Sequence, residues 1–139
     1  MVALLQAVIF DMDGVIAETE GDGHRVAFNE TFRRNEIKAE WDQETYAELL
    51  KIPAGKDRLR HYILQNALLP EEGLEDRIID LLRQKTVIFQ DLVKSGQIPA
   101  RPGVRDFIQS LFKANLKVAL ATTGSEKAAH TLLISLLGK

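Results

Sequence analysis

A short apolar run leads directly into two aspartates near residue 10. The run occupies residues 7–10 (AVIF), and the aspartates are Asp11 and Asp13, followed by Gly14. A brief apolar segment bounded by turn residues is typical of a strand buried on both faces of a parallel sheet. Such a strand delivers its carboxylates to the end of the sheet where open α/β folds bind ligands. The pattern therefore predicts an α/β fold with a candidate site at Asp11 and Asp13.

A second apolar run, at residues 118–121 (VALA), predicts a second strand. Between the two runs apolar residues recur at helical spacing, and breakers divide residues 18–92 into a small bundle of helices. Asp42 is expected to cap the helix that carries Tyr46. Residues 95–103 are rich in Gly and Pro and predict a linker before the last elements.

The predicted order is strand, helical insertion, helix, strand and helix. A helix between two apolar strands predicts a parallel pair with a right-handed crossover. We therefore expect a partial Rossmann-like α/β core, formed by residues 1–16 and 93–139, in which two core strands are visible. Residues 17–92 are expected to form an inserted helical cap, with Trp41 and Tyr46 in its interior.

The composition limits the kind of protein. The chain has 139 residues, of which 45% are hydrophobic and 27% charged, and its net charge is −2. These values argue against disorder and give no reason to expect a nucleic acid or a membrane as partner. The absence of cysteine excludes disulfides and thiolate chemistry. The first residues lack the basic segment and cleavage site of a signal peptide, so we expect a soluble, cytoplasmic protein.

Two carboxylates at an open strand end suit phosphoryl transfer. One carboxylate can attack phosphorus to form an aspartyl phosphate, and the other can protonate the leaving group and then activate water. Because two anions repel a phosphate, the chemistry also needs a hard divalent cation, for which Mg²⁺ is the natural choice. The alternative is that residues 11–14 form only a solvated turn. The apolar residues on both sides of the aspartate pair favour the catalytic interpretation.

Residues 10–19 (FDMDGVIAET) resemble motif I of the haloacid dehalogenase-like hydrolases, and residues 118–123 (VALATT) are similar to their motif II. A helical insertion directly after motif I is the arrangement of the beta-phosphoglucomutase-like members. Several further stretches resemble the CbbY-like branch most closely, and members of that branch are sugar-phosphate phosphatases. These stretches are residues 18–20, 24–29, 55–58 and 95–104. The resemblance implies a haloacid dehalogenase-like core with a helical cap.

The resemblance also implies a role for each matching residue. Asp11 would be the nucleophile and a Mg²⁺ ligand, and Asp13 would be the general acid–base and a second Mg²⁺ ligand. The implied substrate-binding residues lie in or near the cap and after the second strand. They are Glu18, His24, Lys56, Arg58, Thr122 and Thr123. The implied substrate is a small phosphorylated sugar.

Simpler interpretations of these residues stay open. Lys56 and Arg58 could belong to a solvated basic helix face, and His24 could be a structural histidine. Thr122 could cap the helix that follows, although a helix N-terminus also attracts phosphate, so the two roles are compatible.

The third and fourth motifs of the family, which supply a lysine and further acidic Mg²⁺ ligands, have no match in the sequence. We therefore expect a chain truncated before them, and three functions follow. The first is a Mg²⁺-dependent sugar-phosphate phosphatase whose C-terminal half is missing, the second a non-catalytic fragment or interaction module, and the third a sugar phosphomutase. The exposed sheet edge would favour pairing with the missing half or self-association.

Overall fold

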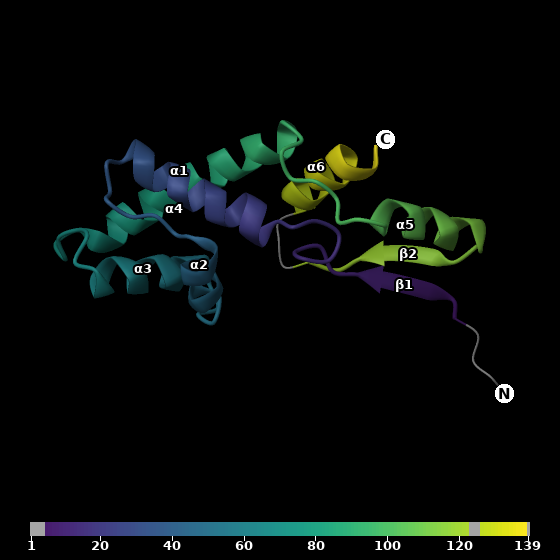
Figure 1. The fold of residues 1–139 in the computed structure, drawn as a ribbon, viewed down its shortest axis with the longest axis horizontal. Coiled ribbons are helices and arrows are strands. Elements are labelled where there is room, and N and C mark those ends of the chain that lie inside the picture. The colour runs from purple at the N-terminus through teal and green to yellow at the C-terminus, as the bar shows by residue number, and fades with distance from the viewer. Residues whose placement is uncertain (1–4, 123–125, 139) are drawn as a thin grey trace. The chain divides into compact units, whose positions relative to one another are not determined.

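The computed structural model describes residues 5–122 and 126–138 of the chain. Two strands and seven helical segments follow one another in these ranges (Figure 1). They are β1 (Ala7–Phe10), the π-helical turn η1 (Glu20–His24), α1 (Arg25–Arg34), α2 (Gln43–Leu49), α3 (Gly55–Gln65), α4 (Leu74–Lys94), α5 (Val104–Lys113), β2 (Lys117–Leu120) and α6 (Glu126–Leu137). The α/β fold class and the order of elements predicted from the sequence are confirmed.

The described residues form two compact units. Residues 1–20 and 93–139 form the first, which we call the core unit, and residues 21–92 form the second, the cap unit. The sequence predicts divisions after residues 16 and 92, and the structure has them after residues 20 and 92. None of the described helices is long and apolar enough to cross a membrane.

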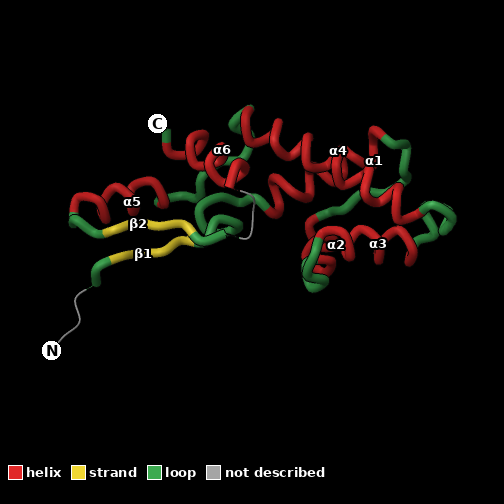
Figure 2. Tube along the Cα trace, turned by 180° about the vertical axis from the view of Figure 1, so that it is seen from behind, coloured by secondary structure: helices red, strands yellow, loops and turns green. Residues whose placement is uncertain are grey.

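The core unit contains a two-stranded parallel sheet. Ala7 lies opposite Lys117 and Phe10 opposite Leu120. The ladder continues past the last paired residues, because the Ala121 N–H donates to the Phe10 carbonyl at 2.8 Å. Figure 2 shows the two strands as neighbours and α5 alongside β2, joined to it by a short turn. The carboxyl ends of both strands therefore lie at the same edge of the sheet.

One face of this sheet is covered and the other is open. The buried Phe10 ring meets Phe107 of α5 edge to face, with the ring centroids 5.9 Å apart. Ile9 points to the opposite face, as alternation along a strand requires, and is 68% exposed. The prediction that the first strand is buried on both faces is therefore wrong for Ile9, because no described element covers its side of the sheet.

The cap unit is built around Trp41. Its side chain is fully buried, and its ring centroid lies 4.5 Å from that of Phe28 and 5.7 Å from that of Tyr46. The Asn29 side chain accepts a hydrogen bond from the Trp41 N–H and donates one to the Trp41 carbonyl, both at 2.8 Å. The predicted interior positions of Trp41 and Tyr46 are confirmed.

The start of α2 also follows the prediction. Asp42 has extended backbone angles, and its side chain accepts a hydrogen bond from the Thr45 N–H at 2.7 Å. This bond satisfies an amide that has no partner inside the helix and lowers the pKa of the Asp42 carboxyl. The predicted N-cap is confirmed.

Candidate active site

A tight loop follows β1 and carries the aspartate pair. The Gly14 N–H donates to the Ala17 carbonyl at 2.8 Å, and the Ile16 N–H donates to the Met12 carbonyl at 3.0 Å. Gly14 has φ +71°, a left-handed conformation that glycine adopts without steric cost. The sequence therefore folds here into a turn that ends the strand and keeps the aspartates at its carboxyl end.

A pocket of about 570 Å³ opens at this edge of the sheet within the core unit. Its lining brings together Asp11 and Asp13 from the β1 end and Thr122 from the β2 end. All three residues were among the predicted site residues, although more than a hundred positions separate Thr122 from the two aspartates in the sequence. Glu20 also lines the pocket and was not among the predicted site residues. Thr123, predicted beside Thr122, lies outside the described residues.

The two aspartates differ in their surroundings. Asp11 is exposed, and its side chain accepts a hydrogen bond from the Met12 N–H at 2.7 Å. Asp13 is half-buried and accepts a hydrogen bond from the hydroxyl of the fully buried Thr19 at 2.5 Å. Asp13 is thus anchored by a neighbouring side chain, whereas Asp11 is open to an incoming group.

The oxygen-only donors of this pocket fit Mg²⁺. Proteins usually bind this ion through one or two carboxylates and leave its other positions to water and substrate phosphate, and Asp11 and Asp13 offer that donor set. Over residues 5–122 and 126–138 no group of three or more histidine, aspartate or glutamate side chains is placed to hold a metal ion. The carboxylate oxygens of Asp11 and Asp13 are hard donors, which suit Mg²⁺ better than the softer nitrogen and sulfur ligands that zinc usually takes.

Glu18 belongs to the core unit and contacts Arg101. The Arg101 guanidinium donates to the Glu18 carboxylate at 3.0 Å and to the Gly14 carbonyl at 2.8 Å. Thr19, Glu20 and Arg101 are the residues of this site that sequence reasoning missed. All three lie within stretches that resemble the family, residues 10–20 and 95–104, and this resemblance is the signal that could have indicated them.

The predicted basic residues of the cap unit have protein partners. The Lys56 ammonium forms an ion pair with Glu75 at 3.1 Å. Arg58 is buried and donates to the Leu49 carbonyl at 3.0 Å and to the Ile52 carbonyl at 3.2 Å. These bonds join α3 to the last residue of α2 and to the segment that follows it, so Arg58 has a structural role within the cap unit.

His24 is largely buried at the start of α1. The Lys85 ammonium, which can only donate, lies 2.8 Å from His24 Nδ1, so that nitrogen is the acceptor. The imidazole stacks on Phe89 with the ring centroids 4.1 Å apart. Burial, and then the nearby charges of Lys85 and Arg58, lower the pKa of His24 to about 3. His24 is therefore neutral near pH 7, with its hydrogen on Nε2.

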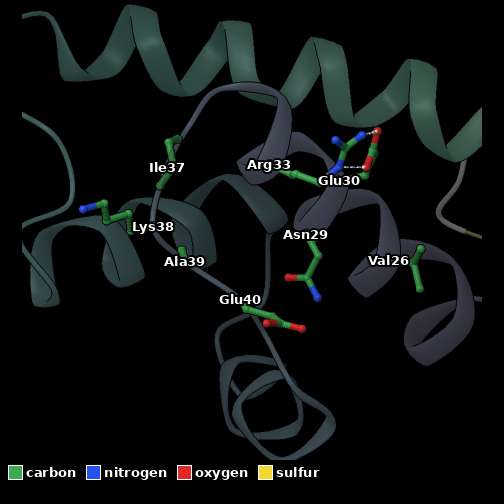
Figure 3. Close-up of a pocket in the computed structure, with 8 residues that line it drawn as sticks. All are labelled: Val26, Asn29, Glu30, Arg33, Ile37, Lys38, Ala39 and Glu40. Carbon is green, nitrogen blue, oxygen red and sulfur yellow. Dashed lines mark hydrogen bonds and ion pairs between the residues drawn. The ribbon is translucent and has the colours of Figure 1, made fainter.

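A second cavity, of about 660 Å³, lies in the cap unit beside α1 and the segment that follows it (Figure 3). None of the predicted site residues lines it. Glu30 and Arg33 pair at its edge, and hydrogen bonds from Arg33 and Arg34 lower the pKa of Glu30 to about 2. The Glu30 carboxylate at this edge is thus already paired with two arginines.

A carboxylate pair at the carboxyl end of a parallel strand, followed along the chain by a helical unit, defines an α/β protein with a candidate site at its strand ends. The chain belongs to the haloacid dehalogenase-like hydrolases, whose family model matches residues 5–139. It is 42% identical over 126 residues to Protein CbbY of Cereibacter sphaeroides, which covers 88% of this chain and 51% of that protein. It is 38% identical over 144 residues to a CBBY-like protein of Arabidopsis thaliana, covering 99% of this chain and 45% of that one.

Solved structures agree with this assignment. The crystal structure of CbbY from Rhodobacter sphaeroides in complex with phosphate has a TM-score of 0.76 and 37% identity, over 98% of this chain and 59% of that one. An aspartate-to-asparagine mutant of the same protein was crystallised with xylulose-(1,5)bisphosphate. A putative beta-phosphoglucomutase from Thermotoga maritima has a TM-score of 0.66 and 26% identity, over 95% of this chain and 56% of that one. The chain spans about half the length of the relatives it matches.

Proposed function

We propose that this chain carries the nucleophile and the general acid–base of a Mg²⁺-dependent phosphatase that acts on a small sugar phosphate. The observation that carries the proposal is the pocket shared by Asp11, Asp13 and Thr122 at the carboxyl ends of β1 and β2. Its carboxylates and hydroxyl are the groups that attack, protonate and orient a phosphoryl group.

In the first half-reaction an Asp11 carboxylate oxygen bonds to phosphorus while the bond from phosphorus to the sugar oxygen breaks. Asp13 gives its proton to that leaving oxygen, so a free sugar hydroxyl and an aspartyl phosphate result. In the second half-reaction Asp13 takes a proton from water, whose oxygen attacks phosphorus. Inorganic phosphate leaves and the Asp11 carboxylate is restored, so that no net charge or proton is lost.

Asp11 and Asp13 would hold the Mg²⁺ ion, Asp11 through its carboxylate and Asp13 through its backbone carbonyl. The bound ion supplies positive charge that offsets the repulsion between two carboxylates and a phosphate dianion. Thr122 donates its hydroxyl hydrogen to a phosphoryl oxygen. Its place in the pocket that Asp11 and Asp13 also line supports this role.

The remaining substrate-binding residues are proposed from the resemblance. Glu18 would accept hydrogen bonds from sugar hydroxyls, and Lys56 would offer positive charge to a phosphate. Neutral His24 would donate from Nε2, since its Nδ1 already accepts from Lys85. Arg58 is the weakest of these proposals, because its donors serve the backbone carbonyls of Leu49 and Ile52.

The relatives indicate the substrate class. The CbbY structures from Rhodobacter sphaeroides contain phosphate and xylulose-(1,5)bisphosphate. A similar phosphorylated sugar is the natural first substrate to test on this chain. Its two phosphates would need a second cationic group besides the Mg²⁺ site, and Lys56 is the candidate within the cap unit.

The test is release of inorganic phosphate from sugar mono- and bisphosphates, with Mg²⁺ and with EDTA, by the purified chain alone and by the chain together with the half of a full-length relative that it does not span. We expect Mg²⁺-dependent release that Asp11→Asn abolishes and that Asp106→Asn, on the exposed face of α5, leaves unchanged. Release that survives Asp11→Asn would contradict the assignment of the nucleophile. No release of phosphate even when that half is supplied would favour the alternative of a non-catalytic chain.

The similarity to a putative beta-phosphoglucomutase favours a second candidate, a sugar phosphomutase. A mutase would return the phosphoryl group from Asp11 to a different sugar hydroxyl instead of to water. Analysis of the products by ³¹P NMR separates the two candidates. Free phosphate supports the phosphatase, and an isomeric sugar phosphate supports the mutase.

A further inference from the structure

The segment after α4 lies against the loop that carries the aspartates, within the core unit. Ala100 forms an antiparallel bridge with Ala17, and the Arg101 N–H donates to the Ile16 carbonyl at 2.8 Å. Ile16 and Ala17 have almost no exposed surface. The backbone of residue 101 is therefore fixed beside the loop by a hydrogen bond and by packing.

The Arg101 side chain returns to the same loop. One terminal nitrogen of the guanidinium donates to the Gly14 carbonyl at 2.8 Å and to the Glu18 carboxylate at 3.0 Å. Each terminal nitrogen of arginine carries two hydrogens, so both bonds form together. Arg101 thus connects the turn that follows Asp13 to the predicted substrate-binding carboxylate.

The two guanidinium bonds of Arg101 are expected to fix the orientation of the groups they join more than to stabilise the fold. The Arg101 side chain is 48% exposed and that of Glu18 is 42% exposed, and ion pairs at such sites are screened by water. The loop also has backbone bonds of its own, such as that from Gly14 to Ala17, so it does not depend on the guanidinium alone to stay folded. Loss of the guanidinium removes its bonds to the Gly14 carbonyl and to the Glu18 carboxylate, and it is therefore expected to loosen the loop locally and to widen the range of Glu18 orientations without unfolding the core unit.

We propose that Arg101 is a positioning residue for substrate recognition: it fixes Glu18 and offsets its negative charge so that Glu18 can accept sugar hydroxyls beside a phosphate. This inference rests on the proposed phosphatase function. An unpaired carboxylate near the Asp11 and Asp13 pocket would repel an anionic substrate, whereas a carboxylate paired with Arg101 repels it less. Lysine carries the same charge but lacks the planar fork, so it replaces only part of the role.

The kinetic test compares a sugar phosphate with p-nitrophenyl phosphate, which has no sugar hydroxyls. We expect Arg101→Ala to lower kcat/KM for the sugar phosphate about tenfold, mainly through KM, and to change p-nitrophenyl phosphate hydrolysis by less than about threefold. Arg101→Lys should be intermediate. Arg83→Ala, an exposed arginine of α4, is the matched control. Equal losses with both substrates would indicate a merely structural role and overturn the proposal, as would no loss with either.

A second measurement does not depend on turnover. In wild type and Arg101→Ala, amide hydrogen exchange is followed by NMR at Gly14, whose N–H bonds to Ala17. We expect exchange about tenfold faster in the variant and unchanged in Arg83→Ala. Unchanged exchange in Arg101→Ala would show that the guanidinium does not hold the loop and would overturn the inference. A wild-type chain without turnover would count against the proposed function, while the exchange result would still decide whether Arg101 positions the loop.

Discussion

The Thr19 hydroxyl donates a hydrogen bond to the Asp13 carboxylate, and Thr19 itself is fully buried. The loop between these residues is closed by the backbone bond from Gly14 to Ala17, which brings the two side chains together. A buried donor can satisfy only a carboxylate that points inward, so the bond selects one orientation of Asp13. Thr19 is therefore a positioning residue for the proposed general acid–base.

Replacement of Thr19 by valine should test this relationship. Valine keeps the shape of threonine but cannot donate, so Asp13 loses its anchor and proton transfer to the leaving group slows. We expect kcat for a sugar phosphate to fall about ten- to a hundredfold, and less for p-nitrophenyl phosphate, whose leaving group needs little protonation. Thr19→Ser retains the hydroxyl and should restore most of the rate. Equal losses in Thr19→Val and Thr19→Ser would attribute the effect to packing instead.

The sequence predicted the features of the site that depend on local pattern. The apolar run before Asp11 and the second run before Thr122 each indicate a strand, and parallel pairing places their carboxyl ends together. The predicted helical cap, with Trp41 inside it, follows from apolar spacing in the same way.

Contacts between segments far apart in sequence could not be predicted. The bond from Arg101 to Gly14 joins residues separated by 87 positions, and it exists only because the Ala100 backbone lies against the loop. The exposure of Ile9 depends on what covers one face of the sheet, which apolar character does not reveal. The burial of Arg58 could not be predicted either, because the sequence of a charged stretch does not show which of its basic side chains is buried and which is exposed to solvent.

Arg58→Ala is expected to destabilise the chain, because it removes a buried side chain whose guanidinium donates to the Leu49 and Ile52 carbonyls and to the Tyr46 hydroxyl. A loss of about 2–3 kcal/mol in the free energy of unfolding is expected from urea denaturation. The matched control is Arg60→Ala, whose guanidinium lies on the surface and pairs with Glu75, and it should change stability far less. If both variants unfold at the wild-type urea concentration, Arg58 has no structural role and its proposed contact with substrate gains support.

Gly14→Ala and Gly73→Ala form a second matched pair. Both glycines have φ +71°, and a Cβ atom built on either one meets no atom within 4 Å. Each substitution should therefore cost only the left-handed strain, about 1 kcal/mol in urea denaturation. Only Gly14→Ala should also lower kcat, because Gly14 lies in the loop with Asp11 and Asp13 while Gly73 precedes α4 in the cap unit. Equal activity in the two variants would show that the loop tolerates the strain without moving the aspartates.

His24 should make stability depend on pH. Its pKa falls from 6.5 to about 3 in the folded chain, because burial and the Lys85 ammonium disfavour the imidazolium. Between these values the unfolded chain binds a proton that the folded chain does not, so stability is full above pH 6.5 and decreases as pH falls toward 3. The pKa values of Glu30 and Glu75 are also lowered in the folded chain, but these shifts change the stability only as pH falls below the ordinary glutamate value of 4.5. Between pH 7 and pH 5 the change in stability therefore comes from His24 and not from these two carboxyls.

Urea denaturation at pH 7 and pH 5 measures this dependence. The wild-type chain should lose on the order of 1–2 kcal/mol of unfolding free energy between the two values. His24→Gln cannot take up the proton but keeps an acceptor for Lys85, so most of the loss should disappear. His61→Gln, at an exposed position of α3, is the control for removing a histidine. A wild-type slope that persists in His24→Gln would mean that another group causes it, and that the imidazole is accessible to protonation in the folded chain.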